Sequence, residues 1–314
     1  MKKILKILLT IGILVFIIWK FDINLTSLFS SIQNTVYLLL ALMFPLFILP
    51  LISANRWKLF LKEVGIHENI FELVKISWIS VFQGIILPSS QGQDVLRIYY
   101  IEKRHPDKRG AAGSTIIIER MIGFVILCIL SLFFSIFSTG IPNKKQVVLI
   151  IGLISLALFV IILLLMNKRL HRYISNKSFS NKYVNRFFSY FNKVYEAIAY
   201  FPYKRVLLSS TVLILLFQLS TIFCVYLIFK AYGCDIPYYQ HVAIYPIISI
   251  LSMVPITISG FGIREGFFVY FYSQLGVASE IAVGVSLFNY MIVVLTPALL
   301  GCIFYFIDIF KKKN

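Results

Sequence analysis

The stretch VPITISGFGIREGFFVY, residues 254–270, interrupts one of the chain's longest apolar regions. It places a proline, two closely spaced glycines and the adjacent pair Arg264 and Glu265 where a lipid-facing helix carries apolar side chains. Proline and glycine break helices, and a break in lipid leaves backbone N–H and C=O groups without partners. The stretch therefore predicts a helix break that is buried in protein or lines a polar cavity at membrane depth.

The composition of the whole chain places that break inside a membrane protein. The 314 residues are 59% hydrophobic and only 14% charged, which excludes an ordinary soluble globule. We expect an all-α, polytopic membrane helix bundle that forms a single integral membrane domain over residues 1–314. Six apolar runs are each long enough to cross a hydrocarbon core of about 30 Å. These runs are residues 4–19, 36–54, 111–138, 146–166, 206–229 and 281–307.

The formal net charge of +17 has to be explained by where the basic residues lie. They are found between the apolar runs, so they indicate membrane topology and not nucleic-acid binding. The sequence shows no paired cysteine spacing, no metal-ligand pattern and no glycine loop in the context of a nucleotide-binding fold. We therefore expect no cofactor, no metal and no nucleic-acid partner.

Two further apolar stretches, 70–101 and 238–275, are each broken near the middle. The first break lies in ILPSSQGQDVLRIYY and the second in the stretch quoted above. Each break joins two segments that are too short to be ordinary spans, so each stretch is expected to be a pair of half-helices. The residues expected to break the helices and line a cavity are Pro88, Gly92, Pro255, Gly260 and Gly262.

The basic residues predict how these two stretches run through the membrane. With the N-terminus in the cytoplasm, the segment 55–68, which carries Arg56, Lys58 and Lys62, lies there too. Most of the 30 Lys and Arg residues fall on that side only if each broken stretch returns to the face from which it enters. We therefore expect two re-entrant hairpins that enter from opposite faces, as in an inverted repeat, with both termini cytoplasmic.

Six charged residues remain at membrane depth, and each costs on the order of 2.5–3.5 kcal/mol at a helix centre. A half-helix that starts after a break offers unpaired N–H groups to an anion, and an arginine fork suits phosphate. The functional interpretation is a site for a lipid head group, in which Arg97 and Arg264 converge from the two hairpins. The alternative is a set of internal ion pairs that hold the hairpins against the third span. The six residues are Asp94, Arg97, Glu119, Arg120, Arg264 and Glu265.

The segment 167–205 combines many basic residues with an apolar stripe at helical spacing. This pattern is typical of a helix that lies along the membrane surface and binds anionic lipid. A helix packed beneath the bundle is the alternative.

Four motifs, in this order, resemble the lysylphosphatidylglycerol synthase transmembrane region. The motifs are RWKLFLKEVG (56–65), LPSSQGQDVLRIYYIEKR (87–104), IIIERMIGF (116–124) and PITISGFGIREG (255–266). The resemblance covers nearly the whole chain and implies a flippase-like bundle in the cell membrane that moves lipids or lipid-linked intermediates between leaflets. By position the pattern is carried by Asp94, Arg97, Glu119, Arg120, Gly260, Gly262 and Glu265. Members of this family usually have an adjacent Gly-Asp pair in the second motif, whereas here Gln93 separates Gly92 from Asp94 and leaves the turn geometry open.

The family resemblance also bears on enzyme activity. The two-domain synthases add a soluble domain that transfers an amino acid from charged tRNA to lipid. This chain ends at YFIDIFKKKN, directly after its last apolar run, so we expect no such catalysis. A lipid translocator is the leading hypothesis. The alternatives are a membrane-embedded transferase acting on a lipid-linked substrate and a non-transporting membrane partner of a lipid- or glycan-synthesis enzyme.

Overall fold

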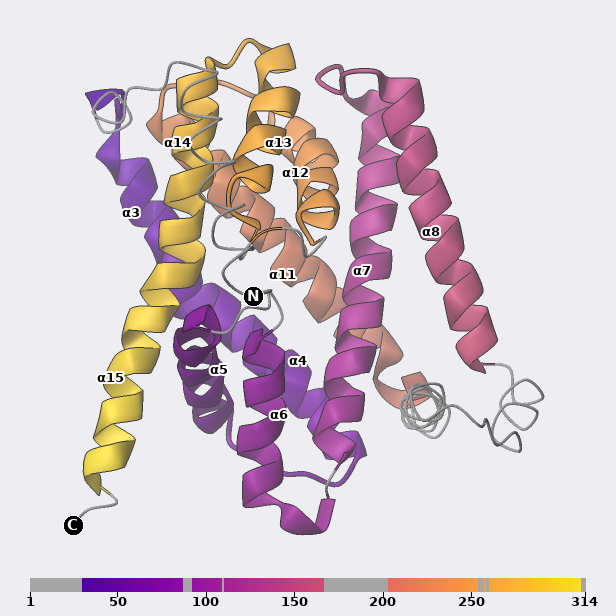
Figure 1. The fold of residues 1–314 in the computed structure, drawn as a ribbon, viewed down its shortest axis with the longest axis vertical. Helices are drawn as coiled ribbons and strands as arrows, with labels where there is room; N and C mark the ends of the chain where they lie inside the picture. Colours follow the sequence, from indigo (N-terminus) through magenta and orange to yellow (C-terminus); the bar gives the residue numbers. More distant parts are fainter. Residues whose placement is uncertain are drawn as a thin grey trace, which may run out of the picture.

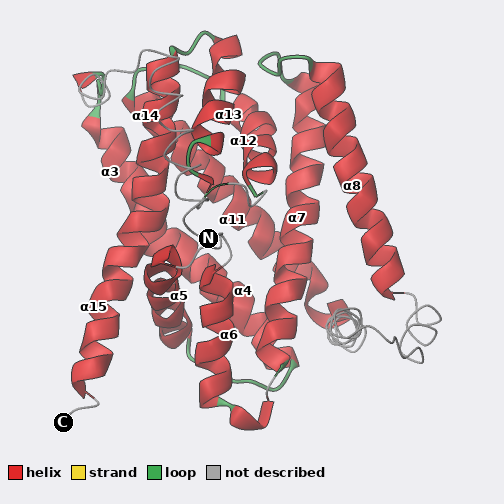
Figure 2. Ribbon diagram, viewed as in Figure 1, coloured by secondary structure: helices red, strands yellow, loops and turns green. Residues whose placement is uncertain are grey.

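The computed structural model describes residues 30–86, 92–108, 110–166, 203–253, 257 and 260–311. Across these residues the regular secondary structure is helical and contains no strand (Figure 2). The prediction of an all-α bundle is therefore confirmed.

The described helices follow one another in a bundle of long and short elements (Figure 1). The N-terminal half contains α3 (Thr35–Met43), η1 (Phe44–Ile48), α4 (Leu49–Glu63), α5 (Ile70–Ile86), α6 (Gly92–Arg104), η2 (Pro106–Lys108), α7 (Ala111–Phe137) and α8 (Lys144–Met166). The C-terminal half contains α11 (Tyr203–Ala231), α12 (Tyr238–Ser252), α13 (Ile263–Tyr272), η4 (Ser273–Leu275), α14 (Ser279–Tyr290), η5 (Met291–Leu295) and α15 (Thr296–Lys311).

Four continuous helices among the described residues are long and apolar enough to cross a membrane. They are Thr35–Glu63, Ala111–Phe137, Arg205–Ala231 and Ser279–Lys311, and they match four of the predicted spans. The helix α8 covers the predicted run 146–166. The predicted run 4–19 and nearly all of the basic segment 167–205 lie outside the described residues.

Two of these long helices contain a π-helical turn beside a proline. The turn η1 contains Pro45, and η5 ends at Leu295, two residues before Pro297. Proline removes one backbone N–H from the helical ladder, and a local widening to a π turn accommodates the loss. Because η1 and η5 contact each other, the two widened turns meet inside the bundle. Such turns are frequent at functional sites, and both of these line the cavity described below.

The two broken stretches form hairpins in opposite halves of the molecule. The helices α5 and α6 contact each other, as do α12 and α13. In Figure 1, α6 starts near mid-height and runs downward, whereas α13 starts near mid-height and runs upward. This is the predicted arrangement of oppositely oriented hairpins. The membrane face from which each one enters, and the side on which the termini lie, stay predictions.

Glycine conformation explains the break in the second hairpin. Gly260 and Gly262 adopt φ angles of +74° and +84°, a region that L side chains rarely occupy. These two glycines lie directly before α13, which begins at Ile263, whereas α12 ends at Ser252. Pro88 and Pro255 lie outside the described residues, and Gly92 is buried at the first position of α6.

Each hairpin packs against its own apolar core. Trp57, Leu61 and Ile101 belong to the core that joins α4, α5, α6 and α7. Phe229 and Phe268 belong to the core that joins α11, α12, α13 and α14. Burial of apolar surface thus holds the two hairpins separately, and each positions its own group of charged side chains.

Candidate functional site

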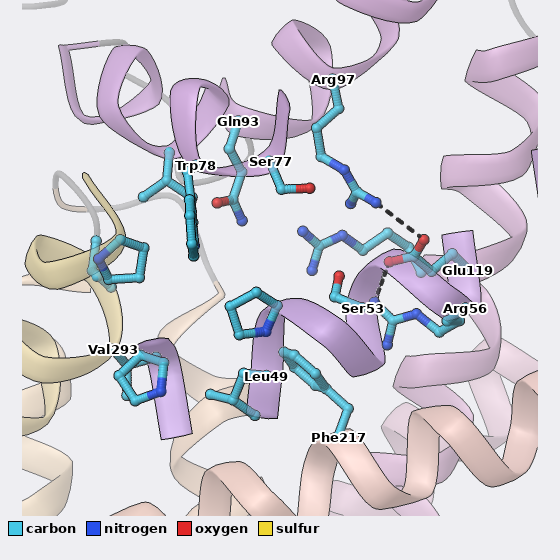
Figure 3. A pocket seen from close by; sticks show the side chains of 16 residues that line it. Leu49, Ser53, Arg56, Ser77, Trp78, Gln93, Arg97, Glu119, Phe217 and Val293 are labelled. Carbon is cyan, nitrogen blue, oxygen red and sulfur yellow. Dashed lines mark hydrogen bonds and ion pairs between the residues drawn. The ribbon is translucent and has the colours of Figure 1, made fainter. Parts of the chain in front are cut away.

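A cavity of about 290 Å³ lies beside the first hairpin. Its walls come from η1, α4, α5, α6, α7, α11, η5 and α15. Figure 3 shows a polar side, where the arginine and glutamate side chains meet, and an apolar side formed by prolines, Leu49, Phe217 and Val293. The polar lining residues are Ser53, Arg56, Ser77, Gln93, Arg97, Glu119 and Arg120.

Glu119 of α7 joins three helices at the polar side of the cavity. Its Oε1 accepts a hydrogen bond from Arg56 Nη2 of α4. Its Oε2 accepts one from Arg97 Nη2 of α6 at 3.5 Å. The side chains of all three residues are buried, so the ion pairs fix α4 and α6 against α7 (Figure 3).

Asp94, in the first turn of α6, forms the second link to α7. Its carboxylate accepts two hydrogen bonds from Arg120, one from Nε at 2.7 Å and one from Nη2 at 3.0 Å. Arg97 Nη1 lies 3.6 Å from the same carboxylate. Although Arg120 lies within a membrane-spanning helix, its side chain is 43% exposed and lines the cavity. The cavity therefore gives access to a fixed guanidinium group.

The charges of these five residues do not balance. We call Arg56, Arg97, Arg120, Asp94 and Glu119 the arginine cluster; it carries three positive and two negative formal charges. The Nε atoms of Arg56 and Arg97 are buried and have no hydrogen-bond partner among the described residues. An excess cation at membrane depth is costly, which makes the cavity a favourable place for one anionic group.

Aromatic rings hold two of the arginines in place. The guanidinium carbon of Arg97 lies 4.1 Å from the ring centroid of Trp57, and that of Arg56 lies 5.1 Å from the ring centroid of Phe217. Trp57 is itself fixed by a hydrogen bond from its indole N–H to Thr115 Oγ1 at 3.2 Å. Cation–π contacts offset part of the cost of burying these cations without adding negative charge.

The charged pair of the second hairpin forms a separate group, which we call the second cluster: Arg264, Glu265 and Ser286. Arg264 donates to Glu265 Oε1 at 2.6 Å, and Ser286 Oγ donates to the same oxygen at 2.9 Å. Glu265 Oε2 accepts from the backbone N–H of Gly262 at 2.6 Å and so caps the start of α13. Both carboxylate oxygens are bonded, and one positive charge balances one negative charge.

The second cluster does not reach the cavity. No described residue of α12, of α13 or of the segment between them lines it, and this includes Gly260 and Gly262. Arg264 lies against the rings of Phe261 and Tyr290 instead. Arg97 and Arg264 thus belong to different clusters, whereas the sequence predicted that they converge.

The comparisons with known proteins identify the family of the chain. The family model for the lysylphosphatidylglycerol synthase transmembrane region matches residues 3–301. The chain belongs to this family. It is similar to a UPF0104 membrane protein of Methanocaldococcus jannaschii, with 26% identity over 98% of this chain and 97% of the relative. It is also similar to one of Pyrococcus horikoshii, with 22% identity over 96% of both chains. A third relative, from Methanothermobacter thermautotrophicus, is 22% identical over 94% of this chain and 90% of its own length.

Membership in this family, together with the four long apolar helices, establishes a multi-pass membrane protein. Three of the four motifs that carry the resemblance meet at the cavity. Arg56 opens the first motif, Arg97 lies in the second and Glu119 in the third. The three motifs are far apart in sequence, and ion pairs join them in the structure.

Arg56 is the member of the arginine cluster that the sequence analysis missed. It was assigned to a cytoplasmic segment with Lys58 and Lys62, but its side chain is buried while those two lysines are exposed. Arg56 is therefore part of the cavity wall and not of an exposed surface, while the side of the membrane on which residues 55–68 lie stays a prediction. The signal was present: Arg56 lies four residues before Phe60, on the apolar face of the helix, whereas the lysines lie on the other face.

The ion pairs form mainly between helices and not between sequence neighbours. Glu119 and Arg120 are adjacent on α7, yet their ion pairs are with residues of other helices. Each instead reaches across to the first hairpin. The predicted pairing of that hairpin with the third span is therefore present, together with the excess arginine that Arg56 supplies.

Proposed function

We propose that this membrane protein binds the phosphate of a lipid head group in the arginine cavity and moves that lipid between leaflets. The supporting observation is the excess positive charge of the arginine cluster, which lines a cavity between membrane helices. A single phosphodiester would neutralise this excess. We extend the proposal to a location in the cell membrane with both termini in the cytoplasm, because that topology puts most basic residues on the cytoplasmic side.

The chemistry of the cavity suits a phosphate more than a neutral ligand. Arginine presents a planar fork of donors that matches phosphate oxygens, and the hydrogen bonds are strengthened by charge. Asp94 and Glu119 hold the forks in place and lower the cost of the cluster when no anion is bound. The volume of about 290 Å³ is at the lower end of ligand sites, which run from roughly 300 to 1,000 Å³. It fits a head group and not a whole lipid.

The same contacts favour binding over catalysis. A general base needs a carboxylate that is free to take a proton from its substrate. Asp94 and Glu119 are both engaged by arginines, and no group of three or more potential metal ligands occurs among the described residues. We therefore extend the proposal to a transporter without enzymatic activity.

A leaflet-resolved assay tests this proposal. The purified protein is reconstituted into vesicles that carry a fluorescent phospholipid, and a membrane-impermeant reductant destroys the fluorophore in the outer leaflet. If the protein translocates fluorescent phosphatidylglycerol, the reductant is expected to destroy more fluorescence than the outer leaflet alone contains. A hexosylceramide with the same fluorophore should lose only its outer-leaflet fluorescence, because its sugar head group carries no phosphate. Excess inorganic phosphate is then added to both compartments. Inhibition of translocation would mean that the site recognises the phosphate alone, and unchanged translocation would mean that it recognises the lipid.

Two variants on α6 connect the assay to the site. Arg97→Gln leaves each carboxylate of the cluster one arginine partner, so the fold is expected to persist while phosphatidylglycerol translocation is lost. Arg104→Gln is the matched control. The side chain of Arg104 is 40% exposed and forms an ion pair with Glu72 at 2.6 Å, and neither residue lines the arginine cavity. Wild-type translocation by a folded Arg97→Gln protein would contradict the proposal.

A further inference from the structure

A second cavity adjoins the arginine cavity on the side of α15. It has a volume of about 530 Å³ and lies between the segment η1–α4, the helix α5 and the helix α15. Pro50 and Trp78 line both cavities. The two spaces are therefore neighbours that share one wall.

The second cavity, which we call the groove, has a mainly apolar lining. Phe47 and Leu51 line it from the side of α4, Phe71 from α5 and Ile307 from α15. All four are large apolar side chains that pack incompletely and stay exposed. They are suited to contact a hydrocarbon chain, whereas the neighbouring cavity is suited to an anion.

Trp78 forms the wall between the two spaces. Its ring stacks on Phe304 of α15, with 5.7 Å between centroids and 20° between planes. Its indole N–H is buried without a hydrogen-bond partner among the described residues. A Cβ added at Gly301 would overlap the backbone of Trp78, so α15 lies directly against α5 there. The close approach of these helices fixes the backbone of Trp78, and its indole side chain forms the wall.

Charged side chains mark the far end of the groove. Lys75 and Lys311 line it together with Glu72. Lys75 also forms an ion pair with Asp308 at 2.5 Å, which joins α5 to α15 beside the groove. The groove thus runs from a charged end to the wall of the arginine cavity.

We propose that this groove holds the hydrocarbon chain of the lipid whose phosphate lies in the arginine cavity, with Trp78 between the head group and the chain. This inference rests on the proposed function and narrows the transported substrate to a long-chain phospholipid, whereas a small phosphoester such as glycerol 3-phosphate occupies the arginine cavity alone. The argument for this occupant is the shared wall: an anionic site and an apolar groove meet at Pro50 and Trp78, as the two parts of a lipid do.

The test fills the groove with a larger side chain and leaves the arginine cavity unchanged. Ile307→Trp places an indole in the groove. Ile303→Trp is the control, because Ile303 is on the same helix, is 56% exposed and lines neither cavity, while Ile307 is 41% exposed. Binding of long-chain phosphatidylglycerol and of glycerol 3-phosphate to the detergent-solubilised protein is measured for each. Leu51→Trp, on the opposite wall, is the second test variant if Ile307→Trp does not fold.

We expect Ile307→Trp to weaken binding of the long-chain lipid about tenfold or more, because steric overlap excludes the chain. Binding of glycerol 3-phosphate should be unchanged, and Ile303→Trp should change neither. Unchanged lipid binding by Ile307→Trp would overturn the inference and leave the proposed function standing. A change in the oligomeric mass of the protein would identify a second copy of the chain as the occupant of the groove and would also overturn the inference. If the wild-type protein binds neither probe, the proposed function itself fails.

Discussion

The two hairpins carry charged clusters that look alike in sequence and differ in the structure. In the arginine cluster, three arginines face two carboxylates beside a cavity. In the second cluster, one arginine faces one carboxylate, and both carboxylate oxygens are bonded. We therefore interpret the second cluster, in which the charges balance, as a structural element. The arginine cluster, which has one excess positive charge, is the candidate binding site.

The largest effect is expected when the balanced cluster loses its cation. Arg264→Gln leaves the fully buried Glu265 without its positive partner. Breaking a buried pair on one side costs about 3–5 kcal/mol, because an uncompensated charge remains in the interior. Thermal unfolding of the purified protein in detergent should therefore occur at a clearly lower temperature.

A charge-neutral double variant determines the role of the second cluster. Arg264→Gln with Glu265→Gln removes both charges, and the glutamine carbonyl is still able to accept from Gly262 N–H. We expect most of the lost stability to return and lipid translocation to remain. A double variant that is stable but inactive would place Arg264 in the lipid path and remove the distinction between the clusters.

The next effect concerns the excess charge of the arginine cluster. Arg56→Gln makes the cluster neutral while Glu119 keeps its bond to Arg97. Hydrogen bonds to charged groups contribute about 1.5–3 kcal/mol, so phosphatidylglycerol binding should weaken roughly 10- to 100-fold. Lys58→Gln, an exposed position two residues along the same helix, is the control and should bind normally. Equal binding by both variants would show that Arg56 only fixes α4 to α7.

A smaller effect is expected beneath Arg97. Trp57→Phe keeps a ring under the guanidinium but removes the hydrogen bond to Thr115. The expected loss is about 1 kcal/mol in the free energy of unfolding. Thr115→Val removes the same bond, so the two changes together should cost less than their sum. Full additivity in denaturant unfolding would mean that this bond does not stabilise the site.

The smallest effect is expected outside both clusters. The ion pair between Lys75 and Asp308 is partly exposed, and such pairs contribute about 0–1 kcal/mol. Lys75→Gln should lower the unfolding temperature only slightly, and high salt should reduce the difference because it screens exposed charges. If Lys75→Gln lowered the unfolding temperature as much as Arg264→Gln, the exposure of an ion pair would not determine how much it stabilises this protein.

The sequence by itself determined the helical class, four of the long spans and the positions of the breaks. Hydrophobic length and the backbone limits of proline and glycine are local properties, so Gly260 and Gly262 could be identified before any contact was known. The sequence also identified Asp94, Arg97, Glu119 and Arg120, because charge within apolar sequence is visible without a structure.

Only the tertiary structure decided which charges meet. Arg56 and Glu119 are 63 residues apart, and their ion pair depends on how α4 packs against α7. Arg97 and Arg264 look equivalent in sequence, yet the packing of separate cores places them in different clusters. The cavity likewise depends on two π turns, η1 and η5, that meet from opposite halves of the chain. Helix packing brings residues together by shape and burial across long sequence distances, and no local pattern records that outcome.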